Sequence, residues 1–124
     1  MRTTIMTSVK PILLGQSPVT FKISIALFLR YSLPSFIFSK KSSFVYRFLP
    51  FVSCREIPHS RDDRLSIIAL DHFSRECGEC VYLLIPCTEK HHAFVERNKE
   101  SLEQKFIIRY PDDILAERKL FPLS

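Results

Sequence analysis

Glycine is scarce in this chain of 124 residues, where only Gly15 and Gly78 occur. Two isolated glycines cannot form the glycine-rich loops that bind phosphate groups, GxGxxG and GxxxxGK. Tryptophan is absent, and the single asparagine, Asn98, does not begin an N-glycosylation sequon. The chain also lacks a GxSxG nucleophile elbow and an HExxH zinc helix. These absences exclude the nucleotide-binding proteins and hydrolases that depend on those motifs.

Acidic residues are missing from the first 55 positions, and the first one is Glu56. Residues 1–55 contain eight basic residues and seven of the eleven phenylalanines, whereas residues 56–124 contain ten basic and all 13 acidic residues. A change of composition this sharp predicts a boundary near residue 55. We therefore expect a basic leader over residues 1–55 and a small mixed α/β domain over residues 56–124.

Three roles compete for residues 1–55: an organelle-targeting leader, a membrane segment and a nucleic-acid-binding arm. Organelle import sequences are rich in arginine and serine and poor in acids, so the composition is typical of a mitochondrial transit peptide. The 17 residues between Lys22 and Lys40 are mostly apolar, but Arg30 near their middle makes insertion across a bilayer marginal and favours an interfacial segment. The expected partners are accordingly a membrane surface or the organelle import machinery, with a protein partner as a further possibility. Nucleic acid is disfavoured because phenylalanine outnumbers tyrosine and the aliphatic runs have no role on RNA.

The second part of the chain begins with a helix pattern. Ser60 and Asp63 have the spacing of a capping box, and Gly78 stands where a helix would end. Between Ser60 and Gly78, side chains at helical spacing predict one buried face that is apolar except for a histidine: Leu65, Ile68, Ala69, His72 and Phe73. We expect His72 to lie in the core or at its boundary. We expect a helix over residues 61–77.

Two apolar runs that each end at a proline predict strands at residues 80–85 and 106–110. The residues between them are rich in helix formers, so Thr88 is expected to cap a helix over residues 89–105. Asp112 or Asp113 is expected to cap a last short helix that runs to Leu120. Strand, helix and strand form a parallel βαβ unit. The predicted fold class is α/β: a small βαβ-like unit with flanking helices over about residues 60–120, behind a basic, apolar, poorly ordered or membrane-associated N-terminal segment.

Cysteine and histidine provide the only candidate chemistry. Cys77, Cys80, Cys87 and His91 have the spacing C-x2-C-x6-C-x3-H, whose outer pairs are familiar zinc spacings. An extended strand between Cys80 and Cys87 would separate them by roughly 20 Å, too far for one ion. A thiol-redox role is the other alternative, although the Cys-x-x-Cys pair ends a helix rather than beginning one. The simpler interpretation makes Cys80 a small buried apolar residue.

No nucleophile, base and orienting group can be assembled from the spacing, and the pairs Asp62–Asp63 and Asp112–Asp113 stand where helix caps are expected. We therefore predict a small non-enzymatic accessory or interaction protein, without a cofactor, targeted to the mitochondrion or a membrane by residues 1–55. One alternative is a zinc-binding or thiol-redox module built on the cysteines. The other is the product of a reading frame with no selected function, motivated by the low glycine content.

Overall fold

The computed structural model describes residues 8–39, 51–56, 63–76 and 80–116. Five parallel strands form one sheet in the order β3-β2-β1-β4-β5. The strands are β1 (Ser8–Leu14), β2 (Ser35–Ser39), β3 (Val52–Glu56), β4 (Cys80–Pro86) and β5 (Phe106–Ile108). The helices are α1 (Pro18–Tyr31), α2 (Asp63–Ser74), α3 (Glu89–Arg97), α4 (Lys99–Glu103) and α5 (Pro111–Leu115).

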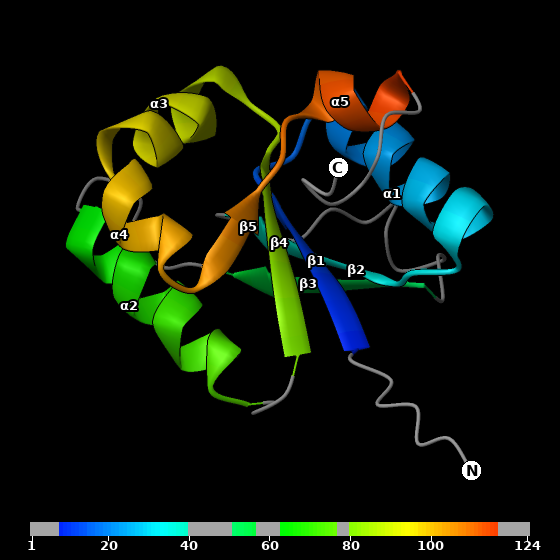
Figure 1. Cartoon of the computed structure of the whole chain (residues 1–124). Helices are drawn as coiled ribbons and strands as arrows, with labels where there is room; N and C mark the ends of the chain where they lie inside the picture. The colour runs from blue at the N-terminus through cyan, green and yellow to red at the C-terminus, as the bar shows by residue number, and fades with distance from the viewer. Residues whose placement is uncertain (1–7, 40–50, 57–62, 77–79, 117–124) are drawn as a thin grey trace, which may run out of the picture.

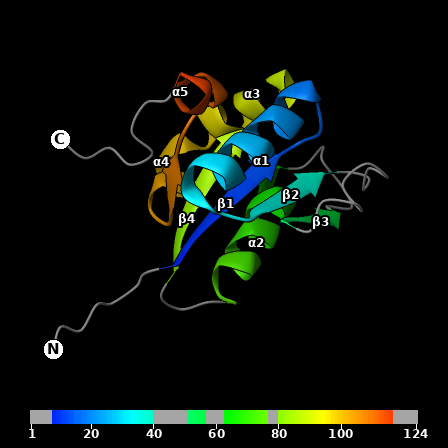
Figure 2. The same cartoon turned by 90° about the vertical axis from the view of Figure 1, so that its right-hand side faces the viewer.

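Helices cover both faces of the sheet. Figure 1 shows α2, α3 and α4 on one side and α1 and α5 on the other, and Figure 2 looks onto the α1 side. The chain moves from β1 to β2 and β3, then crosses to the opposite side of β1 to form β4 and β5. This is the doubly wound arrangement, in which the strand order reverses between β1 and β4.

The central strands are apolar on both faces because each face is covered. Successive side chains of a strand point to opposite sides, so Ile12 and Leu84 pack towards α2–α4 while Leu13 and Leu83 pack towards α1 and α5. All four are fully buried. A continuous apolar run is typical of a buried parallel strand, and it explains why β4 could be recognised in the sequence.

The predicted α/β class with parallel strands is confirmed, and β4 and β5 are parallel neighbours as expected. The arrangement differs for the N-terminal part, which was expected to be poorly ordered or membrane-associated. Residues 8–39 form β1, α1 and β2, and β1 pairs with β4 along seven positions. One sheet therefore contains strands from both sides of the composition boundary. The mitochondrial or membrane targeting expected of residues 1–55 stays a prediction.

The buried face of α2 differs from the predicted one. Leu65 and Ile68 are 45% and 62% exposed and His72 is exposed. Phe73 is buried as predicted, together with Leu70, which the predicted face left out. The helix carries two apolar stripes, and the stripe with Leu70 packs on the sheet because Phe73 fits there against the rings of Phe38 and Tyr82. The placement of His72 in the core or at its boundary was wrong. Ser60, Asp62 and Gly78 lie outside the described residues.

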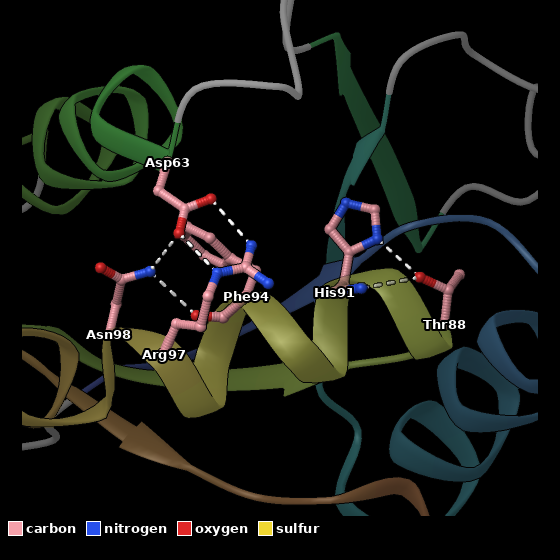
Figure 3. Close-up of polar contacts among 6 residues, drawn as sticks. All are labelled: Asp63, Thr88, His91, Phe94, Arg97 and Asn98. Atoms are coloured by element: carbon pink, nitrogen blue, oxygen red, sulfur yellow. Dashed lines mark hydrogen bonds and ion pairs between the residues drawn. The ribbon is translucent and has the colours of Figure 1, made fainter.

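The predicted helix over residues 89–105 is broken into α3 and α4 at Asn98. The side-chain amide of Asn98 donates to Phe94 O and to Asp63 on α2, so this residue ends α3 and ties it to the neighbouring helix (Figure 3). The last helix also differs in its beginning: Tyr110 is its N-cap residue, and Asp112 and Asp113 lie in its first turn. Residues 117–120 lie outside the described part.

Candidate functional site

Open α/β sheets bind ligands outside the carboxyl ends of their strands, where the strand order reverses. In this protein that position lies between the loop after β1, which contains Gly15 and Ser17, and the loop after β4, which contains Cys87 and Thr88. Both loops lead into helices, α1 and α3. A ligand at the usual position in an α/β sheet would therefore have to fit between these two loops.

Gly15 lies in close contact with α3. Its φ is +89°, a left-handed conformation that favours glycine. A Cβ at this position would lie 2.6 Å from Thr88 Cγ2 and 2.7 Å from His91 Nδ1. The backbone of Gly15 is also fully engaged, since its N–H donates to Phe38 O and its carbonyl accepts from Thr20 Oγ1. The loop after β1 thus closes tightly on the side chains of α3.

Ser17 links the two loops and caps α1 at the same time. Its hydroxyl oxygen accepts from the N–H groups of Val19 and Thr20, and the hydroxyl donates to Cys87 O at 2.8 Å. Pro18 follows at the first helical position and has no N–H. The first turn of α1 therefore has few N–H groups left for a phosphate, unlike the helix that binds the pyrophosphate of a dinucleotide.

Side chains of the protein itself fill the junction between β1 and β4. Thr88 caps α3 by accepting from the His91 N–H, and its hydroxyl lies 2.7 Å from His91 Nδ1 (Figure 3). Burial lowers the pKa of His91, and Lys90 lowers it further. The half-buried imidazole is thus held in its neutral form against Gly15, as a packing group rather than a ligand-binding one.

An open cleft lies one strand further along the same edge, between the carboxyl ends of β4 and β5. It has a volume of about 640 Å³. Its lining comes from the first turn of α1, the loop from β4 into α3 and the loop from β5 into α5: Val19, Pro86, Cys87, Thr88, Glu89, His92, Tyr110, Pro111 and Asp112. The ring of His92 packs against that of Tyr110 with centroids 5.2 Å apart.

Two groups of the cleft that could act as nucleophiles are held protonated. Burial raises the pKa of the Cys87 thiol to about 12. The pKa of Tyr110 is also raised to about 12, first by burial and then by its hydrogen bond to the Glu96 carboxylate, to which its hydroxyl donates. At neutral pH neither group is an anion, and the thiolate is the form of cysteine that attacks or binds metal.

The predicted zinc residues are not brought together in the described part of the chain. Cys80 begins β4 and Cys87 follows its end, so the strand separates them, as its length predicts. Cys80 is half-buried and disulfide-bonded, Cys87 is a buried free thiol, and His91 contacts Thr88. Among the residues that the structure describes, no group of three or more His, Cys, Asp or Glu side chains could hold a metal. Cys77 lies outside these residues.

Sequence reasoning missed the cleft residues Glu89, Tyr110 and Asp112 as a group. They belong to two segments that are far apart in the sequence, and only the parallel pairing of β4 and β5 places their loops side by side. The sequence does contain a signal for this cleft. Two apolar runs each end near a proline, and if they form parallel strands, the loops that follow them lie at the same edge of the sheet.

Comparisons with family models, curated proteins and solved structures found no match for this chain. Within the described residues, no helix has the length and apolar character needed to cross a membrane.

Proposed function

We propose that this protein is a non-enzymatic accessory protein that binds a small amine-bearing ligand in the cleft at the carboxyl ends of β4 and β5. The observation that carries the proposal is the position of the open cleft. It lies at the sheet edge where α/β proteins bind their ligands, and its volume of about 640 Å³ is in the range of small-molecule sites.

The charge of the lining favours a cation over an anion. Glu89 in the first turn of α3 and Asp112 in the first turn of α5 are exposed carboxylates of the cleft lining. The beginning of a helix contributes about half a positive charge, and in α1 much of this is already used by Ser17. Two full negative charges therefore outweigh the helix ends. The ring of Tyr110 adds the aromatic surface on which an ammonium group binds well.

The chemistry of the cleft supports binding rather than catalysis. Cys87 and Tyr110 have pKa values raised to about 12, so neither provides an activated nucleophile at neutral pH. Val19, Pro86 and Pro111 form the apolar part of the lining. An apolar lining with a few polar groups is typical of a site that binds and orients a ligand.

The experiment is an NMR titration of the full chain with ethanolamine, choline and inorganic phosphate. We expect the two amines, and not phosphate, to shift the backbone amide signals of Thr88, Glu89 and Asp112. Glu89→Gln and Asp112→Asn should each weaken amine binding by up to about fivefold, as for an exposed ion pair. Glu100→Gln removes an exposed carboxylate from α4 and serves as the matched control.

Equal shifts with phosphate, or amine shifts that Glu100→Gln reduces as much as Glu89→Gln does, would contradict the amine preference. Saturating amine without shifts at these three residues would remove the cleft as a ligand site.

A second candidate function is association with a membrane surface through the N-terminal part of the chain. A specific observation favours it: α1 exposes large apolar side chains, among them Phe28 and Leu29. This surface lies on α1 and not in the cleft.

A further inference from the structure

Tyr110 lines the open cleft, and two side chains of α3 hold its ring. Tyr110 is the N-cap residue of α5, where its φ is −108° and its ψ is 152°. Its ring packs against that of His92, with centroids 5.2 Å apart and planes at 50°. Its hydroxyl donates to the carboxylate of Glu96, which lies one helical turn further along α3. A residue of the loop after β5 is therefore positioned by the helix that follows β4.

Glu96 acts on Tyr110 from outside the cleft. Its carboxylate is exposed and does not belong to the cleft lining. The hydrogen bond to Tyr110 is the main reason why the pKa of Glu96 is lowered. Burial, and after it the same hydrogen bond, raises the pKa of Tyr110 to about 12. At neutral pH a neutral phenol therefore donates to a carboxylate, and a hydrogen bond to an ionised acceptor is about twice as strong as a neutral one.

The cleft lining is poorly suited to a primary ammonium. Its three N–H groups need acceptors when they leave water. The Cys87 carbonyl and the Thr88 hydroxyl already accept hydrogen bonds from within the protein. Glu89 and Asp112 provide negative charge but are exposed, so a primary ammonium bound beside them gains only the small energy of an exposed ion pair.

A quaternary ammonium fits the same lining better. It has no N–H group, and its methyl groups can lie on apolar carbon atoms and on the face of an aromatic ring. The cleft offers both surfaces, since Val19, Pro86 and Pro111 line it together with Tyr110. The exposed carboxylates of the lining attract its charge without a direct hydrogen bond.

We infer that the cleft selects a quaternary over a primary ammonium, and that Glu96 is a positioning residue that holds the Tyr110 ring for this contact. A ring that is fixed before the ligand arrives loses less conformational freedom on binding, which favours affinity. The inference rests on the proposed function, because it concerns the ligand of the same cleft.

The test is an NMR titration of the full chain with choline and with ethanolamine, followed through the amide signals of Thr88, Glu89 and Asp112. We expect choline to bind about fivefold more tightly than ethanolamine. Tyr110→Leu removes the ring and should weaken choline binding by about fivefold, to the level of ethanolamine. Tyr110→Phe and Glu96→Ala keep the ring and remove its hydrogen bond. Each should weaken choline binding by about two- to threefold, with little effect on ethanolamine.

The combined variant separates the hydrogen bond from the charge of Glu96. Because Glu96 acts through Tyr110, adding Glu96→Ala to Tyr110→Phe should cause no further loss of choline binding. Glu103→Ala is the matched control, since Glu103 is an exposed carboxylate of α4 that interacts with Tyr110 through its charge. Circular dichroism checks that each variant is folded.

Equal affinities for choline and ethanolamine, or an unchanged ratio of the two in Tyr110→Leu, overturn the quaternary selection. A loss in Glu103→Ala as large as in Glu96→Ala, or a further loss in the combined variant, assigns the effect to charge and overturns the role of Glu96. In these cases the amines still bind, and the proposed function stands. Absence of any shift with either amine instead removes the proposed function, and the inference with it.

Discussion

Gly15 shows how a single residue controls the junction between β1 and β4. Its left-handed backbone and missing Cβ allow Thr88 and His91 to fill the space that a dinucleotide would occupy in a protein with a glycine-rich loop. The absence of a second and third glycine from this loop agrees with that closed arrangement. Side chains fill the junction between β1 and β4, and the open cleft lies beside it, at the carboxyl ends of β4 and β5.

Gly15→Ala should destabilise the protein by about 1–3 kcal/mol. The left-handed conformation of a residue with a Cβ costs about 1–2 kcal/mol, and the contact with Thr88 Cγ2 at 2.6 Å adds overpacking. Urea unfolding followed by circular dichroism measures the change. Thr88→Ser keeps the capping hydroxyl and removes the methyl group, so Gly15→Ala should cost less in that background. An equal cost in both backgrounds would show that the contact contributes nothing.

His91 should make stability depend on pH just below neutrality. Its pKa is lowered in the folded protein by burial from the ordinary 6.5, so the unfolded chain binds the proton more tightly. The contribution of His91 is complete above about pH 6.5 and is lost as the pH falls through this value towards the lower folded pKa.

We expect His91→Gln to reduce the fall in the urea midpoint between pH 7.5 and 5.5, a window chosen above the ordinary pKa of carboxylates. His92→Gln changes the exposed neighbour on the same helix and is the matched control. If both variants behave like the wild type, burial of His91 has no effect on its protonation.

At the scale of elements, polar contacts between helix ends join neighbouring helices on one side of the sheet. Asp63 at the first position of α2 accepts two hydrogen bonds from Arg97 at 3.0 Å and one from Asn98 at 2.8 Å, at the end of α3 (Figure 3). The Arg97 hydrogen bond is the main reason why the pKa of Asp63 is lowered. Asp63, expected as a helix cap, thus joins two helices that follow different strands.

Ser17→Ala should lower the free energy of unfolding by about 1–2 kcal/mol. The substitution removes the N-cap of α1 and leaves Cys87 O without the Ser17 hydroxyl donor. Ser17→Asp keeps a capping oxygen but cannot donate to the carbonyl when ionised, so it should give a smaller loss. Ser101→Ala, at an exposed position of α4, is the control and should change stability by less than about 0.5 kcal/mol. A loss in Ser17→Asp as large as in Ser17→Ala would mean that the link to β4 dominates over the cap.

At the scale of the whole molecule, β1 is the central strand and joins the two halves of the sheet. It pairs with β2 on one side and with β4 on the other. β4 therefore depends on a strand from the N-terminal part for the hydrogen bonds along one of its edges. The helix α1 from the same part packs on one face of the sheet together with α5.

Leu13→Ala should lower the free energy of unfolding by about 2–5 kcal/mol, because Leu13 is fully buried between the sheet and α1. Hydrogen exchange should show faster exchange of amides in β4 and in β1 together. Leu29→Ala, on the exposed surface of α1, should change stability by less than about 0.5 kcal/mol. Protected amides in β4 alongside exchanging amides in β1 would show that the two halves fold separately.

The sequence alone determined the local features of this protein. The apolar run of β4, the cap at Thr88 and the class of the fold follow from side-chain chemistry over a few neighbouring positions. The scarcity of glycine by itself also excluded a dinucleotide site of the GxGxxG type, because that site needs glycines at fixed positions of one loop.

Only the tertiary structure decided which stripe of α2 is buried, where β1 lies and which loops form the cleft. Leu65 and Leu70 are equally apolar in the sequence, and packing against Phe73 and the sheet selects one stripe. The pairing of β1 with β4 joins segments about 70 positions apart. The two segments differ in composition, yet their strands pair by hydrogen bonds. The energy of a parallel strand pair depends on its register and on the helices that cover it, and a local sequence pattern contains neither.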